Sequence, residues 1–180
     1  MKNLRFVLPA LLLAGLTASG CFLLSGQWVI DYHFPTPLNI TEGALSKVAV
    51  DLNTISIYND HKDDLKDVED LALVGTVENN ATAANLEVWM VPAGGSNFVT
   101  AAAVRSGTGS RKIWGPMAIG AGATRKIDWD ASAALFTSRA DLVSEIKGDG
   151  VFDLYVISSA DPFSLTITDG VLLAVVSAGK

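Results

Sequence analysis

The segment GTVENNATAANLEVWMV, residues 75–91, carries the pattern that decides the fold. From Leu86 to Met90 the apolar residues fall on alternate positions, and a period of two places them on one face of a β-strand. The Asn79-Asn80 pair ahead of this run is typical of a turn, and a second β-rich run precedes it. The segment therefore predicts two strands joined by a short connection.

Runs of the same kind recur on both sides of this segment, with turn-forming residues between them. Such spacing is typical of antiparallel β-sandwiches and barrels. A chain of 180 residues that is 49% hydrophobic has material for one core. We therefore predict an all-β fold, an antiparallel β-sandwich that forms one domain over residues 27–180. The expected strands are GQWVIDYHF (26–34), KVAVDL (47–52), DLALVGTVEN (70–79), ANLEVWMV (84–91), RKIWGPMAIG (111–120), ATRKIDWD (123–130), VFDLYVIS (151–158), FSLTITD (163–169) and GVLLAVVSA (170–178).

Two stretches have the pattern of a helix instead of a strand. In HKDDLKDVEDL (61–71), apolar residues recur at helical spacing. In SRADLVSEIKG (138–148), Ser138 and Asp141 form a capping-box-like start, and Gly148 is placed to end the helix. The sandwich is therefore expected to carry one or two short helical insertions.

The succession of strands and turns over residues 75–129 resembles that of immunoglobulin-like and fibronectin-type sandwiches. In those domains an Asn-containing turn joins two strands, and an apolar residue and a Gly-rich turn precede another strand. The resemblance implies an immunoglobulin-like sandwich, and a fold alone does not imply a function. The matching positions are Val77, Asn79, Val88, Ile119, Gly122, Ile127 and Trp129.

The first 21 residues, MKNLRFVLPALLLAGLTASGC, have the three parts of a secretory signal. Lys2 and Arg5 make the start positive, an apolar stretch follows, and small residues precede Cys21. This arrangement resembles a bacterial lipoprotein signal peptide, whose lipobox places small residues ahead of a cysteine. The resemblance implies that residues 1–20 are removed and that lipid is attached to Cys21, the single cysteine of the chain.

Two other interpretations of this N-terminus stay open. Ala18 stands where a lipobox most often has Leu, and Ala18 with Gly20 also suits an ordinary signal peptidase, which would leave an exported protein without lipid. The second is an uncleaved anchor helix, although Thr17, Ser19 and Gly20 interrupt the apolar run. On the lipoprotein interpretation, residues 21–26 form a short linker, so the domain lies close to its membrane.

Charge limits the partners of the mature chain. Removal of residues 1–20 takes away Lys2 and Arg5 and leaves 11 basic against 19 acidic residues, a formal charge of −8. A surface of this sign repels phosphate backbones, so nucleic acid is not an expected partner. Phe22 stands in place of the Asp that retains enteric lipoproteins in the inner membrane, so the resemblance implies the outer membrane. We expect a membrane contact through the lipid and a protein partner in the cell envelope, and the sequence leaves the oligomeric state open.

Residues with catalytic or metal-binding chemistry are sparse. His33 and His61 are the only histidines, and neither stands at the spacing that supplies two metal ligands. The chain contains no G-x-S-x-G elbow. We interpret the acidic segment 60–70 as a solvated helix face because it lacks the pattern of an EF-hand loop, with a calcium site as the alternative. We therefore expect a non-enzymatic protein without a cofactor or metal.

The four tryptophans separate into two predicted groups. Trp28 and Trp129 share strand faces with apolar neighbours and are expected in the core. Trp89 shares its face with Glu87, and Trp114 precedes a Gly-Pro pair at an expected strand end, so both are candidate ligand-binding aromatics near the surface. The sequence thus favours a lipid-anchored interaction or structural module. The alternative is a carbohydrate- or surface-ligand-binding lipoprotein that uses Trp89 and Trp114.

Overall fold

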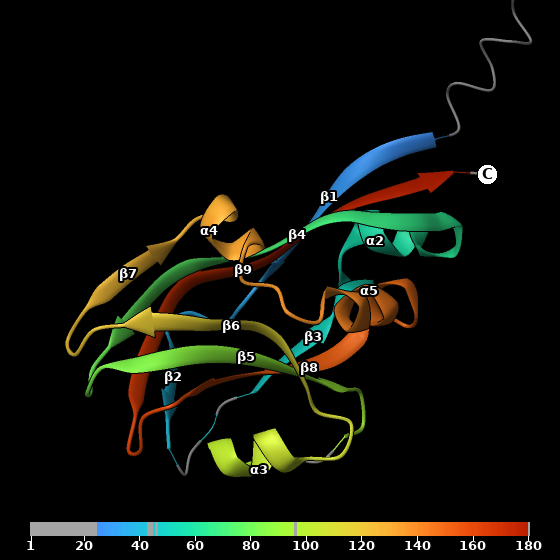
Figure 1. Ribbon diagram of the computed structural model, residues 1–180. Helices are drawn as coiled ribbons and strands as arrows, with labels where there is room; N and C mark the ends of the chain where they lie inside the picture. The colour runs from blue at the N-terminus through green and yellow to red at the C-terminus, as the bar shows by residue number, and fades with distance from the viewer. Residues whose placement is uncertain (1–24, 43–44, 46, 96, 180) are drawn as a thin grey trace, which may run out of the picture.

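Two antiparallel β-sheets pack face to face in a computed structural model of the protein, which describes residues 25–42, 45, 47–95 and 97–179 (Figure 1). This arrangement confirms the predicted all-β sandwich. The expected signal peptide and Cys21 lie outside the described residues. Sheet A has the order β1-β9-β4-β7, with β2 also paired to β9, and sheet B has the order β3-β8-β5-β6. The strands of sheet A are β1 (Ser25–His33), β2 (Leu38–Thr41), β4 (Leu65–Asn79), β7 (Thr124–Ile127) and β9 (Ser164–Gly179), and those of sheet B are β3 (Lys47–Asp51), β5 (Ala84–Pro92), β6 (Arg111–Ile119) and β8 (Val151–Ser158).

Strand β9 forms the centre of sheet A. It pairs with β1 and β2 along one side and with β4 along the other. We expected two strands here, separated by a turn at Asp169-Gly170, and this expectation is wrong. Asp169 adopts a positive φ of 52°, and the pairing with β4 shifts register opposite it, between Val74 and Thr76. A bulge of this kind absorbs the irregularity, so one strand continues through it.

Four short α-helices connect the strands within the described residues, more than the one or two that the sequence predicted. The helix expected over 138–148 is confirmed, whereas the helix expected over 61–71 is wrong, because β4 begins at Leu65 and pairs with β9 from that residue onward. None of the described helices has the length and apolar character needed to cross a bilayer. The helices are α2 (Ser56–His61), α3 (Ala101–Ser106), α4 (Trp129–Ala133) and α5 (Arg139–Lys147), with the 3-10 turns η2 (Leu52–Thr54) and η3 (Lys62–Asp64).

The core fills the space between the inner faces of the two sheets. In β5, Leu86, Val88 and Met90 are buried, whereas Glu87 and Trp89 lie on the outer face, as the alternation predicted. A cavity of about 40 Å³ remains between the sheets, and its lining is almost entirely apolar. This volume is far below the roughly 150 Å³ of an apolar cavity that binds benzene, so we interpret it as a packing void.

Helices α4 and α5 close one side of the sandwich between β4 and β6 (Figure 1). Ser132 Oγ accepts a hydrogen bond from Leu73 N at 2.7 Å, which joins α4 to the edge of β4. Arg139 Nη2 donates to Val68 O at 2.8 Å and joins α5 to the same edge. On the β6 side, Gly115 N donates to Leu135 O at 2.9 Å. The edges of both strands are therefore covered along this side.

Candidate functional site

Trp89 lies on the outer face of sheet B, in register with Tyr155 of β8 and Lys112 of β6. Its indole is half-buried, and Trp89 Nε1 donates to Glu87 Oε2 at 3.0 Å. Residues two apart on a strand point to the same face, so the position of Glu87 follows from the strand itself. The expected placement of Trp89 beside Glu87 is therefore what the structure shows.

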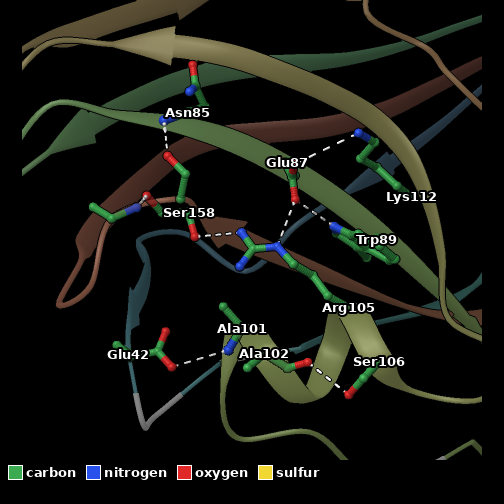
Figure 2. A network of polar contacts seen from close by, with 12 residues as sticks. Glu42, Asn85, Glu87, Trp89, Ala101, Ala102, Arg105, Ser106, Lys112 and Ser158 are labelled. Atoms are coloured by element: carbon green, nitrogen blue, oxygen red, sulfur yellow. Dashed lines mark hydrogen bonds and ion pairs between the residues drawn. The ribbon is translucent and has the colours of Figure 1, made fainter.

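Glu87 is the centre of a polar cluster that also contains Arg105 and Lys112 (Figure 2). Its side chain is only 16% exposed, and its carboxylate lies 3.3 Å from Arg105 Nε and 3.9 Å from Lys112 Nζ. Two cations and an indole N–H therefore surround one carboxylate, and the cluster carries a net positive charge in an otherwise acidic protein.

Helix α3 brings Arg105 to this cluster from the connection between β5 and β6. Thr100 caps the helix, since its Oγ1 accepts a hydrogen bond from Ala103 N at 3.2 Å. Val104 is fully buried beneath the helix, and Arg105 Nη2 donates to Ser158 O of β8 at 2.9 Å. Sequence reasoning did not identify Arg105 or Lys112 as site residues, because no local pattern indicates which strand a short helix in a long connection will cover.

Trp114 does not belong to this site. Its side chain is 2% exposed, and its Nε1 donates to Ser132 O and Ser132 Oγ, both at 3.1 Å. The prediction that Trp114 lies near the surface is therefore wrong. The Gly115-Pro116 pair does not end the strand, because β6 continues past it to Ile119.

The two tryptophans expected in the core are both half-buried. Trp28 lies on the inner face of sheet A and stacks on His61 of α2, with ring centroids 4.2 Å apart. Trp129 was expected on a strand, but β7 ends at Ile127 and Asp128 caps helix α4 through a 2.9 Å hydrogen bond from Ala131 N. The indole of Trp129 instead donates to Asp70 Oδ2 of β4 at 3.0 Å.

The acidic segment 60–70 does not form a helix face. Its residues are divided between the end of α2, the turn η3 and the first part of β4. His33 is exposed and its Nε2 lies 3.3 Å from Asp31 Oδ2, while His61 is engaged with Trp28. In the described part of the chain, no three His, Cys, Asp or Glu side chains gather in an arrangement that suits a metal ion.

A second polar feature is a groove of about 190 Å³ between α5 and the end of the β5–β6 pair. Burial raises the pKa of the Glu145 carboxyl above its ordinary value, and the nearby carboxylates Asp149 and Asp141 raise it further. The folded protein therefore holds the proton of Glu145 more tightly than the unfolded chain does. The groove is lined by Met90, Pro92, Gly109, Arg111, Asp141, Ser144 and Glu145.

Replacing Glu145 with glutamine is expected to raise the melting temperature at pH 7. Because the pKa of Glu145 is raised on folding, its contribution to stability falls as pH rises from its unfolded pKa, about 4.3, through its folded pKa. The gain of Glu145→Gln should therefore shrink toward zero below about pH 4, where both states are protonated. Thermal melts across this pH range, with Glu78→Gln on the exposed side of β4 as the matched control, measure the effect. A lower melting temperature at pH 7 would contradict it.

No family model matches the chain, and no curated protein matches it significantly.

Proposed function

We propose that this protein is a lipid-anchored component of the cell envelope that acts as a non-enzymatic interaction module. The observation that carries the proposal is the N-terminal sequence, in which the single cysteine follows a positive start, an apolar stretch and small residues. Strand β1 begins at Ser25, only four residues after Cys21. Four extended residues reach about 14 Å, so an acylated Cys21 would hold the sandwich against its membrane, and Phe22 favours the outer membrane where the cell has one.

The outer face of sheet A is the surface best suited to a partner. The outward positions of β9 are Val171, Leu173 and Val175, and all three are partly exposed. Val29 and Val74, which are paired with Val175 and Val171, extend the same surface onto β1 and β4. We call these five residues the outer stripe. Outward positions of a two-layer sandwich are ordinarily polar, so an apolar stripe indicates a surface that another molecule covers.

The charges beside the outer stripe favour a protein partner with basic groups around an apolar centre. Asp31 is paired with Leu173 on one side of β9, and Asp70 is paired with Val175 on the other. The formal charge of −8 for residues 21–180 disfavours anionic lipid head groups and nucleic acid as the covering molecule. We therefore propose another envelope protein as the partner.

Replacing Cys21 with serine is expected to abolish incorporation of a labelled fatty acid in living cells. Serine lacks the thiol that receives the diacylglycerol, so the modification has no acceptor. Gel fluorography of cells fed an alkyne-labelled palmitate, with Ser25→Ala as the matched control, measures the incorporation. Label retained by Cys21→Ser at the level of the control would contradict the lipid anchor.

A second candidate function, binding of an envelope saccharide, is favoured by the cluster around Trp89. A half-buried indole held by Glu87 and flanked by Arg105 and Lys112 combines a stacking surface with charged groups, as saccharide sites do. A photoreactive residue at position 173 discriminates between the two candidates. Adducts with a second protein in intact envelopes support the interaction module. Retention of the protein on purified cell-wall polysaccharide, lost in Trp89→Ala, supports the saccharide site instead.

A further inference from the structure

We propose that the outer edge of β1 pairs with β1 of a second copy of this chain. The two strands would run antiparallel about a two-fold axis at Val29, and the two copies of sheet A would become one continuous sheet. The occupant is therefore the protein itself, and the contact is main-chain hydrogen bonding along a sheet edge.

On the edge of β1 that faces away from β9, backbone N–H and C=O groups point outward, toward the position of a further strand. Beyond the end of β1, Phe34 N donates to Gly170 O at 2.8 Å and continues the β1–β9 register. Because N–H and C=O groups on a strand alternate between its two sides, the even-numbered residues face β9 and the odd-numbered residues face outward. The groups available to a further strand are therefore those of Gln27, Val29, Asp31 and His33. No other described residue forms a hydrogen bond with them on this side.

The edges of β6, β3 and β7 have partners or charge protection. The outer edge of β6 is covered at Gly115 and by the hydrogen bond from Thr137 N to Ile113 O at 2.9 Å. The edge of β3 is contacted by Tyr32, whose hydroxyl donates to Ala49 O at 2.6 Å. Strand β7 is only four residues long and exposes charged side chains.

Strand β1, by contrast, is nine residues long and is the outermost strand of its part of sheet A (Figure 1). Its exposed side chains include no lysine, arginine or proline, and its one acidic side chain, Asp31, lies 3.3 Å from His33 of the same strand. A long edge of this kind pairs readily with another strand.

The side chains of β1 are complementary to their own copy about Val29. Val29 is the middle residue of the strand and is 53% exposed, so the axis places two exposed valines opposite each other. The same register sets Gln27 opposite Asp31 of the second copy, where the amide can donate to the carboxylate. No like charges face each other in this register. Because paired strands share one sheet, the two outer stripes also meet on the same face.

Thiol crosslinking of the full-length protein in its membranes tests the pairing. Val29→Cys is expected to give a covalent dimer with a short bifunctional thiol reagent, because paired residues of antiparallel strands have Cα atoms about 5.5 Å apart. Val99→Cys is the matched control, since Val99 is 61% exposed but lies beside α3 on the other sheet. A mixture of Gln27→Cys and Asp31→Cys should crosslink better than either variant alone, which tests the register.

A second variant tests the same contact without a crosslinker. Val29→Lys places two like charges opposite each other at the axis, and its exposed position should leave the fold of each copy unchanged, as judged by far-ultraviolet circular dichroism. In detergent, the parent should sediment as a dimer and Val29→Lys as a monomer. A monomeric parent, or crosslinking of Val29→Cys no greater than that of Val99→Cys, would overturn the proposal. The parent chain without an added cysteine should give no crosslink. A crosslinked product of the parent would show that the Cys21 thiol is free, which would contradict the lipid anchor. The sedimentation result would still test whether β1 pairs with a second copy.

Discussion

Trp114→Ala is expected to lower the free energy of unfolding by about 3–5 kcal/mol, the range for removal of a buried tryptophan. Trp114 is 2% exposed, lines the space between the sheets and donates its indole N–H to Ser132 of α4. Its loss would enlarge the existing void and remove the contact through which β6 holds the helix that covers the edge of β4. Because small domains have a total stability of about 5–15 kcal/mol, a large part of the molecules would unfold well below the parent midpoint.

Chemical denaturation followed by far-ultraviolet circular dichroism measures this loss, and Trp89→Ala is its matched control. Trp89 is half-buried on the outer face of sheet B, and Glu87 keeps Arg105 and Lys112 as partners when the indole is removed. We therefore expect Trp89→Ala to cost clearly less than Trp114→Ala. Equal losses for the two variants would contradict the assignment of Trp114 to the core and Trp89 to the surface.

Gly115→Ala is expected to destabilise the protein by about 3 kcal/mol, from a positive φ that costs roughly 1–2 kcal/mol and from overpacking that costs roughly 1–3 kcal/mol. Gly115 has a φ of 96°, and a Cβ added there would lie 2.5 Å from Leu86 O and 3.1 Å from Glu87 Cα. Both are backbone atoms of the adjacent strand β5, which cannot rotate away as a side chain does. Strands β5 and β6 would have to separate at this point.

Gly122→Ala is the matched control for this substitution. Gly122 also has a positive φ, of 63°, but a Cβ added there meets nothing within 4 Å. Gly122→Ala should therefore lose only the free energy of unfolding that comes from the positive φ, roughly 1 kcal/mol. Denaturation midpoints of the two variants separate the steric part from the conformational part. A loss at Gly115 no larger than that at Gly122 would show that β5 moves to accommodate the methyl group.

The errors about the tryptophans have a common physical cause. A strand face assigned from alternation says which residues lie together, but burial depends on what lies on top of them. Trp129 was placed on a strand because Ile127 precedes it by two residues, whereas the carboxylate of Asp128 caps a helix at that point. Trp114 was placed near the surface because Gly-Pro ordinarily marks a strand end. In the structure β6 continues past this pair, and residues 135–137 extend along β6 and cover its outer edge.

The segment after His61 shows the same dependence on distant partners. Its charged residues and spaced apolar residues suit a helix locally, but β9 offers a ladder of backbone hydrogen bonds as far as Ala178, opposite Leu65. Pairing with a long central strand outweighs local propensity, which amounts to only a few tenths of a kcal/mol per residue. The helix over 138–148 had no competing strand, and it forms as predicted.

Local patterns in the sequence were enough to determine the all-β class, most strand positions, the burial of alternate residues in β5, and Trp89 and Glu87 on one face. These properties depend on residues one to four positions apart, which the chain places together wherever it folds. Only the tertiary structure decided that Arg105 and Lys112 join Glu87, that Trp114 is buried, and that no other described strand pairs with the outer edge of β1. Each of these depends on contacts between segments that are distant in sequence, and the packing of the whole chain determines which of those contacts form.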